Sequence, residues 1–199
     1  MARTPLNKAE LARKKRQLAT YQRFLPSLDM KRKQLMAERQ RARRRLEETR
    51  AALEDVNQRA AEQLPMLADE QVEVEGLVRL RDVRLGTQNV VGVSLPVLRE
   101  TTFEVAGYGY LAKPHWVDRA VELLQERLRL DVGERVAAER LDRLERALKT
   151  VTQRVNLFDK VLIPQTQQQI KQIQIALGDA ERAGVVRAKI AKRKRAEAS

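Results

Sequence analysis

The sequence predicts an all-α-dominated fold, a long antiparallel two-helix coiled coil with a small β-hairpin or loop insert between the helices. Charged residues make up 34% of the 199 residues and aromatic residues only 4%, which is little aromatic area for a compact core. The apolar fraction of 43%, carried mostly by Leu, Val, Ala and Ile, is too high for a disordered chain. Prolines and glycines concentrate in the middle of the chain. They divide it into residues 1–64, 65–114 and 115–199.

Residues 1–64 follow a heptad repeat that predicts one long helix. The 3.5-residue spacing is typical of a coiled-coil seam, and long Arg side chains interrupt it at Arg32 and Arg39. The predicted seam residues of this helix are Leu18, Leu25, Leu28, Leu35, Leu46, Leu53 and Val56.

Residues 65–114 form the insert, in which a β-hairpin or a small sheet is predicted. Residues 78–85 alternate between apolar and polar side chains, residues 86–89 (Gly-Thr-Gln-Asn) carry a turn signal, and residues 90–95 are rich in β-branched side chains. Because an isolated hairpin is marginally stable in water, we expect it to pack against the coiled coil or against another protein. An exposed edge strand would offer a docking surface.

Residues 115–199 form the second long helix and a basic tail. Its predicted seam consists of Leu141, Leu144, Leu148, Val151, Val155, Phe158, Leu162, Ile170, Ile173 and Leu177. One four-residue step through Thr166 is a stutter, which unwinds a supercoil locally. Pro26 in the first helix and Pro164 in the second each remove a backbone hydrogen bond, so both are predicted to kink their helices.

The positive charge lies at both ends of the sequence. Residues 1–45 hold 15 Lys and Arg against three carboxylates, and residues 182–199 hold seven against one, within a net charge of +13. An antiparallel return of the second helix would bring these two basic ends together at one tip of a rod.

Few residues are suited to catalysis or metal binding. The chain has no Cys, and His115 is its one histidine. No phosphate-binding loop of the G-x-x-x-x-G-K-[ST] type occurs, and no carboxylate pair has a partner for acid–base chemistry. We therefore expect no catalytic residue, no metal ligand and no cofactor. Nothing resembles a signal peptide or a membrane-spanning run of about 18 apolar residues.

Four basic runs, at residues 13–16, 31–33, 41–45 and 192–195, could each bind phosphate groups. Few aromatic residues are interleaved to stack on bases, and a basic helix can equally face a protein. Composition alone leaves a nucleic-acid-binding coiled coil, a protein-facing helix and a structural scaffold open.

Two stretches of the chain resemble the D subunits of V-type and A-type rotary ATPases. The first runs from Thr4 to Leu18 and continues through residues 28–38, which are similar to the family's L-x-x-K-R-x-x-L-x-x-E segment. The second has a characteristic order: Arg154-Val155-Asn156, Ile163-Pro164, Ile170, Ile173, Leu177, Glu181-Arg182, Arg187, Lys189 and Lys192. After Arg182 the sequence departs from the family pattern, with Ala183-Gly184-Val185-Val186 in place of a charged stretch.

The resemblance implies a non-catalytic central-stalk rotor that couples ATP hydrolysis or synthesis to H⁺ or Na⁺ transport. It implies contacts with the catalytic A and B subunits at the tip with both termini, and with the F and C subunits at the insert end. Such a protein would be cytoplasmic and peripheral to the membrane, without inserting into it and without binding nucleic acid. The residues expected to face the catalytic ring are Arg13, Lys14, Lys15, Arg16, Arg187 and Lys189. Those expected to face the F subunit are Arg79, Arg81, Val83, Leu85, Val91 and Val93.

Overall fold

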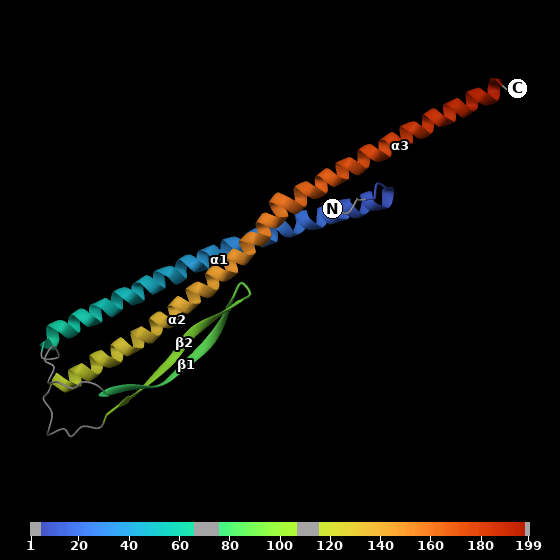
Figure 1. Ribbon diagram of the computed structural model, residues 1–199. Helices are drawn as coiled ribbons and strands as arrows, with labels where there is room; N and C mark the ends of the chain where they lie inside the picture. The colour runs from blue at the N-terminus through green and yellow to red at the C-terminus, as the bar shows by residue number, and fades with distance from the viewer. Residues whose placement is uncertain (1–4, 66–75, 107–115, 198–199) are drawn as a thin grey trace. The chain divides into compact units, whose positions relative to one another are not determined.

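The computed structural model describes residues 5–65, 76–106 and 116–197. Along the chain, a β-hairpin comes between two long helical segments (Figure 1). Thr4 and His115 lie outside the described residues. The elements in chain order are helix α1 (Lys8–Gln63), strands β1 (Val78–Val90) and β2 (Val93–Val105), helix α2 (Trp116–Leu157), a π-helical turn η2 (Phe158–Leu162) and helix α3 (Ile163–Glu197). The predicted fold class is confirmed.

The chain forms two compact units, and each long helical segment contributes to both. Residues 1–32 and 150–199 form the first, here the terminal unit, and residues 33–149 form the second, here the insert unit. Each unit therefore contains one part of α1 and one part of the C-terminal helical segment.

In the insert unit, α1 and α2 run antiparallel and side by side. Arg50 Nε lies 2.7 Å from Glu134 Oε1, and Arg59 Nη2 lies 2.7 Å from Glu126 Oε1. The partner's number falls as the number along α1 rises, which is the antiparallel order. Beneath these pairs the core contains Val56, Leu64, Ala120 and Leu123, with Ala60, Trp116 and Leu130 packed against it.

The two strands pair antiparallel, from Val78 opposite Val105 to Val90 opposite Val93. The turn lies at Val91 and Gly92, where φ is 53° and 78°; two successive positive φ values are typical of a type I′ hairpin turn. The Asn89 side-chain oxygen accepts a 2.9 Å hydrogen bond from the Gly92 backbone N–H.

The predicted position of the turn, residues 86–89, was wrong. These residues belong to β1. Gly86 has a packing reason to be glycine, since a Cβ added there would lie 2.6 Å from Arg99 Nε on the opposite strand. The true turn was hidden because Val91, a β-branched residue, rarely adopts positive φ.

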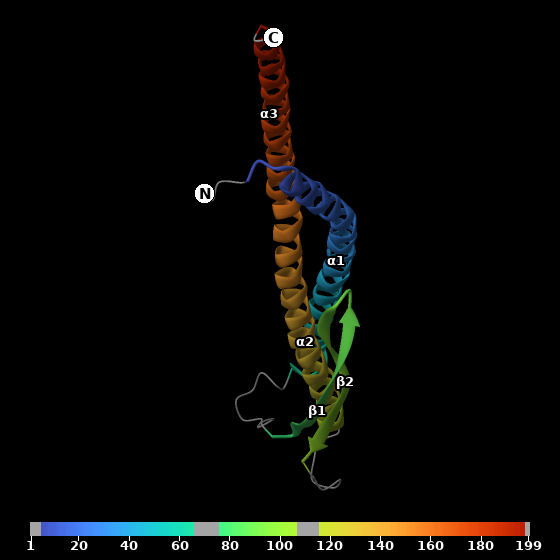
Figure 2. The same cartoon turned by 90° about the vertical axis from the view of Figure 1, so that its right-hand side faces the viewer.

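The hairpin packs along the helix pair of the insert unit (Figures 1 and 2). At its base, Leu77 packs with Val117 and Val121 of α2. Further along β2, Leu95 is fully buried, and Arg143 Nη1 donates a 3.3 Å hydrogen bond to the Ser94 carbonyl oxygen. These contacts hold a hairpin that would be marginally stable by itself.

In the terminal unit, α1 again runs antiparallel to the C-terminal helical segment. The rings of Tyr21 and Phe158 meet edge to face, with centroids 5.3 Å apart, and Lys8 Nζ lies 3.4 Å from Glu181 Oε1. Val151, Val155, Ile170 and Ile173 are buried in this unit.

The π-helical turn ends at Leu162, two residues before Pro164. The Ile163 N–H donates to the Phe158 carbonyl oxygen, five residues earlier, and Pro164 has no N–H to continue the ladder. Just beyond the turn, the Thr166 hydroxyl donates a 2.6 Å hydrogen bond to the Leu162 carbonyl oxygen, and its side chain is buried. The break in the ladder therefore coincides with the predicted stutter, whereas the kinks at Pro26 and Pro164 stay predictions.

Candidate functional site

The residues expected to form the seam are all buried or half-buried. Those nearly inaccessible to solvent are Leu35, Leu46, Val56, Leu144, Val151, Val155, Ile170 and Ile173. Their role in joining the two helices stays a prediction. Ala42, at a heptad position of α1, is also buried. The sequence prediction missed Val117, Ala120 and Leu123 at the start of α2, which are buried as well. The apolar spacing of three to four residues after Trp116 was the signal that could have found the α2 residues.

The cations expected to face the catalytic ring differ in their surroundings. Asn7 caps α1, since its Oδ1 accepts a 2.7 Å hydrogen bond from the Glu10 N–H. The buried Glu10 carboxylate then draws two of the cations: Arg13 Nη2 lies 2.8 Å and Lys14 Nζ 4.0 Å from its Oε1. The side chain of Lys14 is only 15% exposed, so this lysine is turned toward Glu10.

The other four cations of this set are solvent-facing. Lys15 and Arg16 on α1, and Arg187 and Lys189 on α3, are exposed. Within the described part of the chain, their side chains form no hydrogen bond or ion pair. They are consequently available to an acidic partner, and they belong to one unit.

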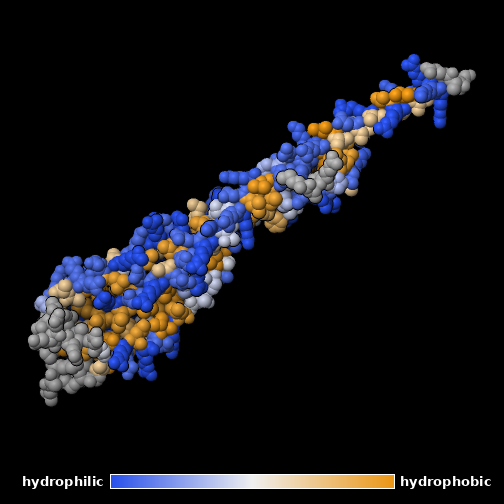
Figure 3. Space-filling model, viewed as in Figure 1, coloured by the Kyte–Doolittle hydropathy of each residue, from blue (hydrophilic) through white to orange (hydrophobic). Residues whose placement is uncertain are grey.

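The residues expected to face the F subunit lie on the hairpin. Arg79, Arg81 and Leu85 are exposed, Leu85 by 57%. Val83, Val91 and Val93 are half-buried. On the face shown in Figure 3, hydrophobic side chains gather over the region where the hairpin lies along α2. This surface combines exposed cations with apolar side chains.

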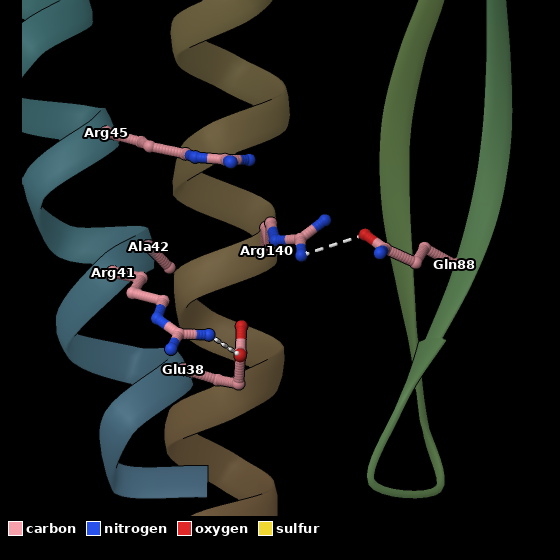
Figure 4. A pocket seen from close by; sticks show the side chains of 6 residues that line it. All are labelled: Glu38, Arg41, Ala42, Arg45, Gln88 and Arg140. Carbon is pink, nitrogen blue, oxygen red and sulfur yellow. Dashed lines mark hydrogen bonds and ion pairs between the residues drawn. The ribbon is translucent and has the colours of Figure 1, made fainter. Parts of the chain in front are cut away.

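A pocket of about 240 Å³ lies between α1, α2 and the hairpin in the insert unit (Figure 4). It is lined by Glu38, Arg41, Ala42, Arg45, Gln88 and Arg140. Burial and the nearby charge of Arg45 lower the pKa of Arg140, while Glu38 acts in the opposite direction. The basic run at residues 41–45 was visible in the sequence, but nothing there indicated that Gln88 and Arg140 join it.

The described residues contain no group of three or more His, Asp or Glu side chains placed to hold a metal ion. In residues 5–65, 76–106 and 116–197, no helix combines the length and the apolar character that crossing a membrane requires.

These features define a class of protein built on a long antiparallel helix pair with a β-hairpin inserted between the helices. Comparison with known protein families identifies the family within this class. The family model for the D subunit of ATP synthase matches residues 10–193, and the chain belongs to this family. The resemblance to the D subunits of rotary ATPases is therefore confirmed.

Curated relatives match along nearly their whole length. The V-type ATP synthase D subunit of Borreliella burgdorferi is 31% identical over 192 residues, covering 96% of this chain and 95% of the relative. The proteins of the same name from Chlamydia pneumoniae and Chlamydia muridarum are each 34% identical over 194 residues. Those two alignments cover 95% of this chain and 91% and 94% of the relatives.

Proposed function

We propose that this chain is the central-stalk rotor of a V-type or A-type ATPase or ATP synthase. In this role it couples ATP hydrolysis or synthesis in a ring of A and B subunits to rotation of a membrane ring that carries H⁺ or Na⁺. The observation that supports the proposal best is the family match along residues 10–193. The chain itself would be non-catalytic, peripheral to the membrane and on its cytoplasmic side.

A rotor shaft must resist twisting, and the contacts between its helices support that role. In the insert unit, α1 and α2 are joined by buried apolar residues and by the pairs Arg50–Glu134 and Arg59–Glu126. Hydrogen bonds to Glu126 and Asp55 raise the pKa of Arg59 despite some desolvation. A helix pair held by both apolar and polar contacts can transmit torque along its length.

We propose that the exposed cations Lys15, Arg16, Arg187 and Lys189 face the catalytic ring. A shaft that turns inside a sleeve has to exchange its contacts among equivalent positions. Solvated ion pairs suit this exchange because each contributes only about 0–1 kcal/mol, so that breaking one during rotation costs little. Arg13 and Lys14 belong to the same basic group and also neutralise Glu10.

We propose that the hairpin is the contact surface for the F subunit and that the C subunit lies at the same end. The exposed Leu85 and the cations Arg79 and Arg81 suit a partner with apolar and acidic side chains. The net charge of +13 also keeps a nucleic-acid-binding role as the second candidate. That role predicts a steep loss of affinity as salt is raised.

The experiment is a reconstitution of the full-length chain with the A, B and F subunits of a V-type ATPase. We expect a stable complex, and we expect a bead attached to the chain to rotate in discrete steps when ATP is added to the immobilised ring. The proposal is contradicted if the chain stays outside the complex in moderate salt while it binds DNA with strong salt dependence.

A further inference from the structure

The pocket of the insert unit carries an excess of positive charge. It brings together Arg41 and Arg45 from α1 with Arg140 from α2, and Glu38 is the only acidic group among the described residues that line it (Figure 4). Arg41 Nη1 lies 2.6 Å from Glu38 Oε1, so this carboxylate forms an ion pair with Arg41. Within the described lining, the guanidinium groups of Arg45 and Arg140 remain without a carboxylate partner.

Among the described residues, neither of the two remaining arginines hydrogen-bonds to a charged group. Arg140 Nη2 donates a 3.1 Å hydrogen bond to the uncharged Gln88 Oε1. The side chain of Arg45 forms no hydrogen bond or ion pair with any described residue. Burial of Arg140 and the nearby charge of Arg45 lower the pKa of Arg140, while Glu38 acts in the opposite direction. Arg140 is half-buried, whereas Arg45 and Gln88 are exposed. Two like charges held near each other are stabilised when an anion lies between them.

Gln88 supplies a further donor. The amide oxygen of Gln88 accepts a hydrogen bond from Arg140. The opposite orientation of the amide would place its NH₂ donors against the N–H donors of Arg140, so that no hydrogen bond could form. The Gln88 Nε2 group therefore keeps its two N–H donors, and among the described residues no acceptor engages them. The pocket is thus lined by one amide NH₂ and by two guanidinium groups that have no carboxylate partner in the described lining, besides that of Arg41.

We propose that Arg45, Arg140 and Gln88 form a binding site for one oxyanion, either a free phosphate ion or a carboxylate group. Guanidinium groups bind both through paired N–H donors. A volume of about 240 Å³ is below the range of about 300–1,000 Å³ that is usual for pockets enclosing larger ligands. Because Gln88 belongs to β1 and the arginines belong to α1 and α2, the bound anion connects the hairpin to both helices.

The test is a titration of the full-length, ¹⁵N-labelled chain with inorganic phosphate at constant ionic strength, followed through the side-chain N–H signals of Gln88 and the arginines. A second arm uses glutarate, which carries the carboxylate of a Glu side chain. We expect saturable shifts in at least one arm. A response to phosphate alone identifies a phosphate site, and a response to glutarate alone identifies a site for a carboxylate side chain; either result supports the oxyanion site.

Matched variants separate this site from the general attraction of a basic chain for anions. Arg45→Gln and Arg140→Gln should each weaken binding by about tenfold or more, because each removes charge-assisted hydrogen bonds. Arg44→Gln is the control, since it removes the same charge from the same helix outside the pocket lining. Far-UV circular dichroism verifies that each variant keeps its helices. The proposal is overturned if neither anion gives saturable shifts, or if all three variants bind equally.

Discussion

Lys8 at the start of α1 lies beside Glu181 in α3, with 3.4 Å between Lys8 Nζ and Glu181 Oε1. Both side chains are strongly exposed, by 80% and 68%, so the pair contributes little stability. Its importance is positional. It shows that the start of α1 lies beside residue 181 of α3, so that residues 182–197 of α3 follow that point in the sequence. This relationship underlies the predictions about the basic end of the chain.

The helix pair should depend on its buried residues and tolerate loss of their exposed neighbours. Leu35 is fully buried and Met36, the next residue on α1, is 49% exposed. Leu35→Ala should lower the free energy of unfolding by about 2–5 kcal/mol, because it removes buried methyl groups and leaves a cavity. Met36→Ala is the control and should change it by no more than about 0.5 kcal/mol. Thermal unfolding followed by circular dichroism measures both, and equal effects would contradict the assigned seam.

The hairpin turn should be sensitive at Gly92. Its φ of 78° lies in the region that costs a residue with a Cβ about 1–2 kcal/mol, so Gly92→Ala should destabilise the hairpin. Val91→Asn should have the opposite or no effect, because Asn accepts positive φ more readily than Val. Amide hydrogen exchange across β1 and β2 reports both changes. Faster exchange in the Val91→Asn variant than in Gly92→Ala would place the turn elsewhere.

Packing between the strands at Gly86 predicts that a second substitution, at Arg99, restores a hairpin that the first one loosens. Gly86→Ala places a methyl group against the Arg99 side chain, 2.6 Å from Nε and 3.1 Å from Cγ. The contact involves the base of the arginine side chain as well as its end, so the variant should loosen the hairpin. The double variant Gly86→Ala/Arg99→Ala should restore the protection of β1 amides from exchange. If the single variant exchanges like the original protein, the strands do not pack as described.

The exposed apolar surface of the hairpin should be needed for binding the F subunit. Leu85→Asp places a charge on a side chain that is 57% exposed, so the fold should tolerate it while the interface does not. We expect capture of the F subunit to fall at least about tenfold, as is common at the central residues of an interface. Ile190→Asp, at a similarly exposed position on α3 (52%), should leave capture unchanged. Full capture by the Leu85→Asp variant would remove the hairpin from the proposed interface.

Neutralising the free cations of the terminal unit should weaken assembly with the catalytic ring. The quadruple variant of Lys15, Arg16, Arg187 and Lys189 to Gln keeps Arg13 and Lys14, which neutralise Glu10. A control removes four charges from the insert unit, at Arg43, Arg44, Arg127 and Arg135. Size-exclusion chromatography of the reconstituted complex at increasing salt should show earlier dissociation for the first variant alone. Identical salt profiles would mean that the stability of the complex depends on the net charge of the chain and not on this surface.

Features that depend on local periodicity were predictable from the sequence. The heptad positions around Leu35 and Leu144 indicated which faces of the helices are buried, and Thr166 marked the step at which the repeat changes. Features that depend on contacts between distant residues were not predictable. Gly86 was predicted to be part of a turn, because the sequence does not show that it packs against Arg99 on the opposite strand. The true turn was not recognised, because its residue Val91 has a positive φ that β-branched residues rarely adopt.

The candidate site divides in the same way. The sequence indicated that Lys14 and Lys15 belong to one basic run. The pairing of Lys14 with Glu10 is a local i,i+4 contact on α1, but the burial of Glu10 was not visible in the sequence. Likewise, Arg45 was visible in a basic run. Its neighbours Gln88 and Arg140 come from other elements, and only the fold brings them together.

The most direct test of the account measures the distance between the start of α1 and the end region of α3. The chain has no native Cys, so spin labels can be placed at Lys8→Cys and Ile190→Cys and their separation measured by pulsed electron paramagnetic resonance. From the contact of Lys8 with Glu181 and the helical rise from there to Ile190, we expect a separation of roughly 15–25 Å. A distribution centred near roughly 100 Å would show that the second helix does not return along the first, and it would contradict the shaft on which the proposed rotation depends.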